Sequence, residues 1–201
     1  MKPSARIVGV DLDNTIICYD QAFHRAAIER GWIDPATPAA KTAVKKSVVG
    51  KVGDRAWTEL QGFVYGAGLD AATAYPGAAA FFAECAGQGI RTVIISHKTQ
   101  YAAAGPRYDL REAAAAWLKS SGLFNFADDS VVFTDTRAAK LEAVRKLGCQ
   151  TLIDDLPEVF RDPSYPGETD FILFDPDQAH PDWTATPRAA SWAEISSRFF
   201  S

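Results

Sequence analysis

Residues Arg6–Ile16 read RIVGVDLDNTI, an apolar run that ends in two acidic residues. The run Ile7–Val10 lacks polar alternation, so it predicts a strand whose two faces are both covered by helices. Asp11 follows it directly, and Asp13 lies two residues further on. Alternate residues of an extended chain point the same way, so both carboxylates are expected at one edge of a sheet. The simpler alternative is a strand followed by a capped turn, because Asp and Asn favour turns.

Further apolar runs predict the rest of the sheet, and helical stretches alternate with them. Strong strand signals lie at Thr92–Ile95, Thr151–Ile153 and Phe171–Phe174, and a weaker one lies at Val131–Phe133. Such alternation implies right-handed crossovers, an α/β fold and a mostly parallel sheet. The helices expected beside this sheet are Gly77–Ala86, Asp109–Lys119, Lys140–Leu147 and Ser191–Phe200.

A helical insertion interrupts this alternation after the first strand. The segment Tyr19–Asp70 carries no strand signal and is punctuated by glycine and proline. An insertion at the carboxyl end of a parallel strand is placed where α/β proteins bind ligands, which is where a lid would lie. We therefore expect a core of residues 1–18 and 73–201 and a cap of residues 19–72. The cap helices are expected at Asp20–Arg30, Ala39–Val49 and Asp54–Tyr65.

Three more elements place polar side chains at strand ends or at a helix start. Ser96 and His97 end the Thr92–Ile95 strand, Lys140 begins a helix, and Asp154 and Asp155 follow the Thr151–Ile153 strand. Each element also has an ordinary structural explanation. Ser96 would cap the loop, Lys140 would be a solvated surface charge, and Asp154 and Asp155 would be an N-cap pair for a short helix. Two neighbouring carboxylates repel each other, and a hard cation such as Mg²⁺ resolves that repulsion. Together with Asp11, these elements are the parts needed for metal-assisted phosphoryl transfer.

Length, composition and charge narrow the class of protein. The chain has 201 residues, a length that predicts one domain, or one domain with an insertion. Its 21 Lys+Arg and 25 Asp+Glu give a formal net charge of −4, and this weak acidity argues against nucleic acid as the main partner. The three cysteines are too scattered for a disulfide framework or a CxxC metal site, and reduced thiols fit a cytoplasmic protein. No apolar run approaches the roughly 18–20 residues that span a bilayer, and the N-terminal segment does not resemble a signal peptide, so no membrane partner is expected.

Four segments together resemble the haloacid dehalogenase-like (HAD-like) hydrolase superfamily, in the superfamily's order. They are DLDNT at Asp11–Thr15, IISHKT with Ser96, Lys140, and LIDD with Asp154 and Asp155. The insertion lies where members with a cap between the first two motifs carry it. The C-terminal FILFDP and SWAEI segments resemble the closing strand and helix of many members. The resemblance implies a three-layer Rossmann-like parallel sheet with a small helical cap.

The resemblance also implies a role for each residue of these motifs. Asp11 would be the nucleophile that forms an aspartyl-phosphate, and Asp13 would protonate the leaving oxygen and then deprotonate the attacking water. Ser96 would bind the phosphoryl group, and Lys140 would stabilise both that group and Asp11. Asp155 would ligate Mg²⁺ directly and Asp154 would support it, with the Asp13 main-chain carbonyl and Asp11 completing the metal site. The function implied is Mg²⁺-dependent hydrolysis of a small phosphorylated metabolite.

Two departures from the family pattern bear on the substrate. His97 follows Ser96 where many members have Asn or Gly, and the loop Thr99–Asp109 is long for its connection. Arg107 in this loop, with His97 and the cap cations, is expected to bind the leaving-group portion of an anionic phosphorylated metabolite. The alternative is that Arg107 and the cap lysines are solvated surface charges. The cap cations are Lys41, Lys45, Lys46, Lys51 and Arg55.

Other functions on the same core stay open at this point. Haloacid hydrolysis needs neither a second acid nor a metal, so Asp13 and the pair Asp154–Asp155 argue against it. Phosphonate hydrolysis needs a Schiff-base lysine, and no cap lysine is marked for that role. A phosphosugar mutase shares the whole core. A non-catalytic phospho-ligand binding protein would be expected to lack Asp11 or Asp13, and both are present.

Overall fold

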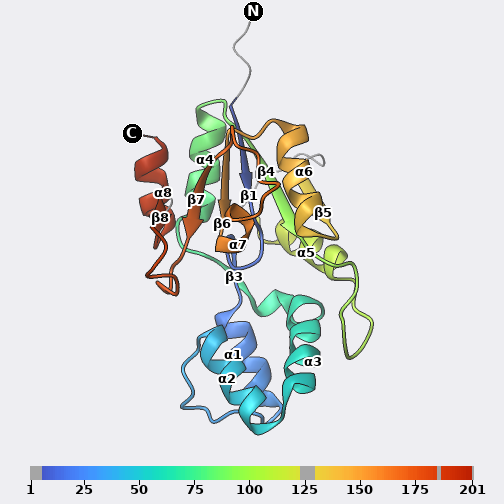
Figure 1. Cartoon of the computed structure of the whole chain (residues 1–201). Helices are drawn as coiled ribbons and strands as arrows, with labels where there is room; N and C mark the ends of the chain where they lie inside the picture. Colours follow the sequence, from blue (N-terminus) through green and yellow to red (C-terminus); the bar gives the residue numbers. More distant parts are fainter. Residues whose placement is uncertain (1–5, 123–129, 185–186, 201) are drawn as a thin grey trace, which may run out of the picture. The chain divides into compact units, whose positions relative to one another are not determined.

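The computed structural model describes residues 6–122, 130–184 and 187–200, and its central feature is a parallel sheet of six strands. Every neighbouring pair of these strands runs parallel, in the order β5-β4-β1-β6-β7-β8 (Figure 1). The expected α/β, Rossmann-like class is therefore confirmed. The strands are β1 (Ile7–Val10), β4 (Arg91–His97), β5 (Val131–Thr134), β6 (Thr151–Asp154), β7 (Asp170–Phe174) and β8 (Arg188–Ala189).

Helices cover both faces of this sheet, which explains why its strands read as unbroken apolar runs. On one face α4 (Ala78–Gly87) packs against α8 (Trp192–Phe199), and the ring of Trp192 lies 5.1 Å from that of Phe81 and 5.8 Å from that of Phe174. On the other face α6 (Arg137–Leu147) and the short α7 (Pro157–Phe160) cover a buried cluster. That cluster includes Val93, Ile95, Leu141, Val144, Leu152, Val159 and Leu173.

Local capping sets where the helices of the sheet begin. The Ser191 hydroxyl accepts a hydrogen bond from the Glu194 amide, as expected of an N-cap. Helix α6 begins at Arg137, three residues before the expected start, because the hydroxyl of Thr136 caps it. Lys140 therefore lies within the first turn of α6 rather than at its first residue.

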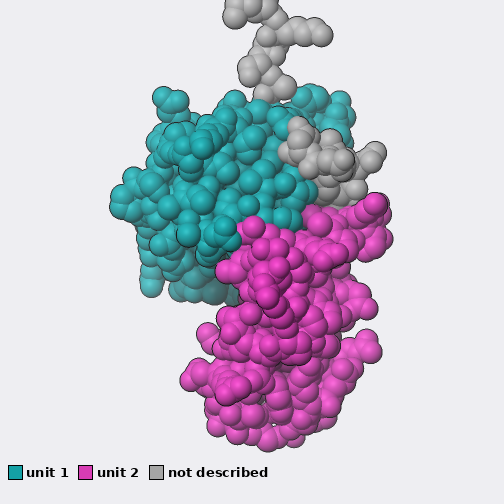
Figure 2. Space-filling view, turned by 90° about the vertical axis from the view of Figure 1, so that its right-hand side faces the viewer, with its two compact units in different colours: residues 1–16, 74–97, 123–201 teal, residues 17–73, 98–122 magenta. Residues whose placement is uncertain are grey.

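Contacts along the chain divide it into two compact units, which Figure 2 shows in different colours. Unit 1 comprises residues 1–16, 74–97 and 123–201 and contains the sheet. Unit 2 comprises residues 17–73 and 98–122 and so includes α5 (Leu110–Ser120), whose Trp117 indole donates to the Ala72 carbonyl at 3.2 Å. The expected core and cap boundaries place residues 98–122 with the sheet, whereas their contacts group them with the insertion.

Unit 2 contains the three helices expected in the insertion, built around an aromatic cluster. The ring of Phe23 stacks on Trp57 with centroids 4.9 Å apart, and Tyr19 meets Tyr65 edge-on at 4.8 Å. The other elements of the described residues are α1 (Asp20–Glu29), α2 (Lys41–Lys51), α3 (Asp54–Tyr65), the 3-10 turn η1 (Leu69–Ala71), and the strands β2 (Ile17–Cys18) and β3 (Thr73–Ala74), which pair as a two-stranded sheet.

Two physical properties of the chain follow from these elements. Across the described residues no helix is both long enough and apolar enough to cross a membrane.

Cys18, Cys85 and Cys149 form no disulfide in this same part of the chain, and burial raises the pKa of both Cys85 and Cys149 to about 11. The two buried thiols are therefore protonated near neutral pH.

Gly9 gives the first testable consequence, because β1 packs against its neighbours with no room for a side chain there. A Cβ at Gly9 would lie 3.2 Å from Leu152 Cδ1 and 3.3 Å from Ile95 Cδ1. Gly9→Val is expected to lower the free energy of unfolding by about 1–3 kcal/mol, the usual cost of overpacking a core. Urea unfolding measures this change. Gly87→Ala is the control, since a Cβ at Gly87 meets nothing within 4 Å, and it should not destabilise the chain. Equal stability of Gly9→Val and wild type would contradict the packing.

Candidate active site

Three adjacent strands bring the predicted polar residues to one edge of the sheet. Strand β1 lies between β4 and β6, and all three run in the same direction. Asp11, Ser96 and Asp154 stand at the carboxyl ends of these strands. The carboxyl ends of the strands form the lower edge of the sheet in Figure 1. The Asp11 amide continues the pairing of β1 with β6 by donating to the Ile153 carbonyl at 2.8 Å. Ligands bind α/β proteins at this edge.

A buried lysine joins two of these carboxylates. The side chain of Lys140 is 2% exposed, and its ammonium donates a hydrogen bond to Asp11 Oδ1 and forms an ion pair with Asp154 Oδ2 at 2.6 Å. The other Asp154 oxygen accepts the Leu156 amide at 3.0 Å. Both oxygens of Asp154 are thus engaged, which favours a supporting role for this residue rather than a direct metal ligand.

Burial is the main reason that the pKa of Asp11 departs from its ordinary value. Burial raises the pKa of Asp11, Lys140 opposes the rise, and Asp154 and Asp13 add to it, which brings the pKa to about 7. Burial alone would lower the pKa of Lys140, but Asp11 and Asp154 outweigh that effect and raise it above its ordinary value. Lys140 therefore stays protonated throughout the physiological range, and Asp11 is a carboxyl that a further positive charge would help to ionise.

Asp11, Asp154 and Asp155 form a group that could hold a metal ion, because one oxygen from each lies within 4.8 Å of the others. Three carboxylates at one edge of the sheet match the hard oxygen ligands that Mg²⁺ prefers. The half-buried Asp155 is also approached by the Thr15 hydroxyl, 3.4 Å from Asp155 Oδ1. The donor set therefore fits a divalent cation, and Asp155 is the least enclosed member of the group.

Ser96 offers an unsatisfied hydroxyl at this edge. The residue is 1% exposed, and among the described residues its Oγ has no hydrogen-bond partner. A buried polar atom without a partner is costly unless a ligand or water completes it. An anionic oxygen placed beside Ser96 would satisfy this donor, as expected of a phosphate-binding residue.

Asp13 and His97 lie close in sequence to Asp11 and Ser96, respectively. Asp13 is half-buried, two residues beyond Asp11, and contributes to the raised pKa of that carboxyl. His97 is exposed, and its Nε2 lies 3.0 Å from the Asp135 carbonyl in the loop before α6. The imidazole thus ties the end of β4 to the segment that leads to Lys140, and its expected contact with substrate stays a prediction.

Arg107 lies in unit 2, within the long loop that follows β4. Its guanidinium carbon is 3.9 Å from the centroid of the Tyr101 ring, and both residues are exposed. The cap cations differ among themselves: Lys51 donates to the Gly31 carbonyl at 3.1 Å, and Arg55 pairs with Glu59 at 3.0 Å. The expected role of Arg107 in binding the leaving group stays a prediction.

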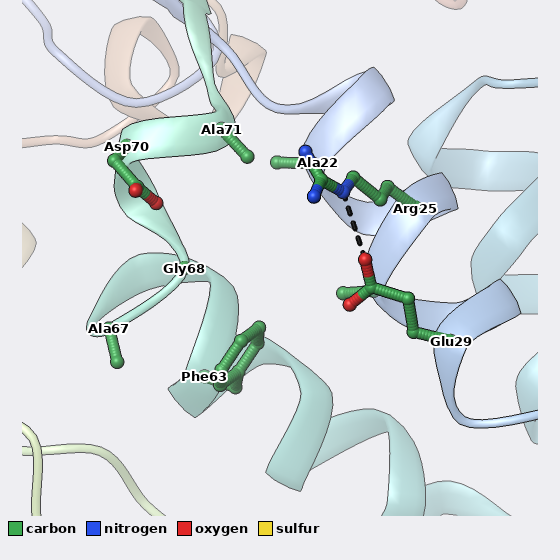
Figure 3. A pocket seen from close by; sticks show the side chains of 9 residues that line it. Ala22, Arg25, Glu29, Phe63, Ala67, Gly68, Asp70 and Ala71 are labelled. Atoms are coloured by element: carbon green, nitrogen blue, oxygen red, sulfur yellow. Dashed lines mark hydrogen bonds and ion pairs between the residues drawn. The ribbon is translucent and has the colours of Figure 1, made fainter.

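A cavity of about 210 Å³ in unit 2 is lined by none of the predicted site residues (Figure 3). It lies between α1 and the segment that runs from α3 into η1, and small side chains leave its middle open. Arg25 on its wall pairs with Glu29 at 2.9 Å, so that charge is already balanced. Nothing in this cavity supplies a nucleophile or a metal cluster.

The sequence patterns did not reveal Thr15 and Trp192 as parts of the site. Trp192 is fully buried, and its indole donates to the Thr15 carbonyl at 3.0 Å, which anchors the turn after β1 to α8. The Thr15 hydroxyl in turn approaches Asp155. Thr15 lies within the quoted motif, but Trp192 is 177 residues away in sequence and carries no local signal of this contact.

Comparisons with solved structures show the fold. The chain is similar to a HAD family hydrolase from Deinococcus radiodurans R1 with bound phosphate and sodium (16% identity, 97% of this chain and 95% of that chain covered, TM-score 0.60). It is similar to the HAD-hydrolase YfnB from Bacillus subtilis bound to magnesium (14% identity, 96% of this chain and 98% of that chain covered, TM-score 0.60). It is also similar to a predicted phosphatase from Clostridium acetobutylicum (13% identity, 98% of this chain and 98% of that chain covered, TM-score 0.58).

These likenesses confirm the HAD-like fold expected from the motifs. No family model and no curated protein sequence matches the chain. The assignment therefore depends on three-dimensional similarity, and the chemistry must be argued from the residues of this chain.

Removing the buried ammonium tests the electrostatics of the site. Lys140→Met leaves Asp11 and Asp154 buried without a cation, and loss of one partner of a buried pair costs about 3–5 kcal/mol. The free energy of unfolding, measured with urea in EDTA, is expected to fall by this amount at pH 8. The loss should be smaller at pH 5, because a carboxyl whose folded pKa lies above its unfolded value of about 3.9 destabilises the fold increasingly as it ionises.

Lys146→Met on the same helix is the matched control for this experiment. Lys146 is 74% exposed and pairs with Glu142 at 3.6 Å, so its removal should change stability little. Equal effects of the two substitutions at pH 8 would contradict the ion-pair arrangement around Lys140.

Proposed function

We propose that the protein is a Mg²⁺-dependent phosphohydrolase that cleaves a small phosphomonoester through an aspartyl-phosphate on Asp11. One observation carries this proposal: Asp11, at the end of the central strand, is shared between the buried Lys140 and a three-carboxylate group. A catalyst for a phosphate dianion must offset negative charge around its nucleophile, and this arrangement supplies the means. The unpartnered hydroxyl of Ser96 at the same edge supports a phosphate oxygen as its ligand.

Mg²⁺ would be held by Asp155 and Asp11 with the Asp13 main-chain carbonyl, while Asp154 holds Lys140. When bound, the ion neutralises charge on the phosphoryl oxygens and on Asp11. The solved structures with phosphate or magnesium bound belong to other proteins of this fold and make the two ligands reasonable here. The metal titration below distinguishes Mg²⁺ from Mn²⁺ at this site.

The reaction follows from the residues around the phosphoryl group. An Asp11 oxygen attacks phosphorus, the phosphorus–oxygen bond to the leaving group breaks, and Asp13 gives its proton to the leaving oxygen. Lys140 and Ser96 hold the oxygens of the transferring group. Asp13, now ionised, takes a proton from water, whose oxygen attacks the phosphorus of the aspartyl-phosphate. Inorganic phosphate leaves, Asp11 is a carboxylate again, and Asp13 again carries its proton.

Residues of unit 2 would determine which substrate the protein binds. The residues of unit 1 account for the phosphoryl chemistry, whereas the insertion and the Arg107 loop are the variable parts in such folds. We assign His97 and Arg107 to the leaving-group portion of an anionic phosphorylated metabolite, and we expect the insertion to act as a lid that excludes water. The YfnB structure is described as showing interdomain movement, which supports a mobile insertion on this fold. A cytoplasmic location, which accords with the free cysteines, is part of the same proposal.

The first test of this function removes the nucleophile. Asp11→Asn keeps the shape of the side chain but cannot form the aspartyl-phosphate, so phosphatase activity on a panel of phosphomonoesters should fall to background. EDTA should silence the wild type, and a titration with Mg²⁺ should restore it, with Mn²⁺ run in parallel. Asp182→Asn, at an exposed acid in another loop, should leave activity unchanged. Substantial turnover by Asp11→Asn with an intact fold would refute the covalent mechanism.

A second test separates acid catalysis from a structural role for Asp13. Asp13→Asn is expected to slow hydrolysis of an alkyl phosphate by roughly 10²–10⁴, the usual range for general acid–base catalysis. The loss should be much smaller for p-nitrophenyl phosphate, whose leaving group needs no proton. Steady-state rates on both substrates give the comparison. The same loss on both would show that Asp13 shapes the turn instead.

A further inference from the structure

Trp192, the first residue of α8, is a buried tryptophan whose one polar group is used outside its own helix. Its ring lies 5.1 Å from that of Phe81 and 5.8 Å from that of Phe174. The indole N–H donates to the Thr15 carbonyl at 3.0 Å, a contact between residues 177 positions apart. A phenylalanine would also supply an apolar ring at this place, so the distinct contribution of tryptophan is this hydrogen bond.

The backbone of Gly77 approaches Trp192 closely, which restricts where the tryptophan can lie. Gly77 has a φ of 89°, and a Cβ at this position would lie 3.1 Å from Trp192 Cβ. The Ser191 hydroxyl caps α8 one residue before Trp192. A helix cap and a close backbone contact thus fix the start of α8, and the indole reaches Thr15 from a defined position.

The turn that receives this hydrogen bond follows Asp11 directly and carries Asp13. Within it the Ile16 amide donates to the Leu12 carbonyl at 3.0 Å, and the Ile16 carbonyl accepts the Tyr75 amide at 2.8 Å. Asn14 has a left-handed backbone with a φ of 59°, a conformation that is uncommon outside glycine. The indole of Trp192 therefore adds a side-chain anchor to a turn that contains an unfavourable backbone conformation.

Thr15 connects this anchor to the acidic group of the candidate site. The residue is fully buried, its carbonyl accepts the indole hydrogen bond, and its hydroxyl donates to Asp155 Oδ1 at 3.4 Å. Asp155 belongs with Asp11 and Asp154 to the group that could hold a metal ion. A hydrogen bond to a ligating carboxylate orients its oxygens and tunes the affinity for the metal. The position of the Thr15 backbone therefore bears on how Asp155 presents its oxygens to a cation.

We propose that Trp192 is a positioning residue for the cation site: its indole N–H holds the Thr15 turn so that the Thr15 hydroxyl orients Asp155. An indole N–H is a donor only and cannot ligate a cation, so its effect must pass through Thr15. The inference rests on the cation site of the proposed function, but not on the phosphatase reaction. It makes the start of α8 part of the support of that site.

Binding of Mn²⁺ near neutral pH, followed by the loss of the free-ion EPR signal, tests the proposal without any substrate. Thr15→Val removes the hydroxyl and should weaken Mn²⁺ binding roughly tenfold or more, the usual cost of losing a partner of a metal ligand. Trp192→Phe removes the indole N–H and should weaken it by about threefold to tenfold, because the turn loses one anchor. The double variant should bind no more weakly than Thr15→Val alone, since both losses act along one path.

A second replacement at position 192 separates the lost hydrogen bond from the lost volume. Benzothienylalanine keeps the bicyclic shape of tryptophan and has sulfur in place of the N–H, so it should weaken Mn²⁺ binding as Trp192→Phe does. It decides the question should Trp192→Phe fail to fold. Trp117→Phe is the matched control, because this buried indole also donates to a backbone carbonyl, that of Ala72 at 3.2 Å, within unit 2. It should bind Mn²⁺ as wild type does, and urea unfolding in EDTA checks that each variant is folded.

Any of three results in the variants would overturn the proposal. Unchanged Mn²⁺ affinity after loss of the indole N–H would show that the turn needs no such anchor. Losses that multiply in the double variant would show that Trp192 does not act through Thr15. Equal weakening by Trp117→Phe would assign the effect to a general loosening of the fold.

Measurements on the wild type separate this proposal from the proposed function. Absence of Mn²⁺ binding at about 10 mM would overturn both the positioning role of Trp192 and the metal of the proposed reaction. A wild type that binds Mn²⁺ but hydrolyses no phosphomonoester would overturn the proposed function alone, and the variants would still decide the role of Trp192.

Discussion

The buried ammonium of Lys140, placed between Asp11 and Asp154, is the interaction on which the candidate site depends. A charge in a protein interior is tolerated only when partners compensate it, so β1, β6 and α6 must meet at this point for the fold to be stable. The same contact holds Asp11 beside Asp155 and therefore keeps the acidic group together. Under the proposed function, structure and chemistry share one constraint, because the lysine that balances the resting carboxylates would also offer positive charge to an incoming anion.

Hydrogen bonds between loops keep Lys140 at that point. The Thr136 hydroxyl caps α6, and the Thr134 hydroxyl donates to the Ser96 carbonyl at 3.3 Å, which joins β5 to the end of β4. The His97 ring adds a contact to the Asp135 carbonyl. On the other side of the site Trp192 anchors the Thr15 turn to α8. The carboxyl edge of the sheet is thus held by contacts from both of its faces.

Short-range patterns predicted the parts of this arrangement that arise from neighbouring residues. The apolar runs identified the main strands, and their ends identified Asp11, Ser96, Asp154 and Asp155. Lys140 could be singled out only through the family resemblance, because a single lysine in a helix usually lies in solvent. Contacts between distant residues were not predictable: Asp20 Oδ1 accepts the Lys41 amide at 2.8 Å, which starts α2 two residues beyond the expected position. The two-residue strand β8 is too short to give a periodic signal.

The loop after β4 shows most clearly how contacts can group residues differently from their order in the sequence. It lies between elements of the sheet in sequence, yet it packs tightly on α3 and its C-terminal end: a Cβ at Gly62 would lie 2.8 Å from Ala102 Cβ, and one at Gly66 would lie 2.5 Å from Tyr108 Cβ. Such close approach is open only to glycine, so these two positions hold the loop within unit 2. The loop and the insertion therefore belong to the same compact unit. Under the proposed function, the loop that carries Arg107 and the insertion expected to act as a lid belong to one compact unit, in which two glycines allow their close packing.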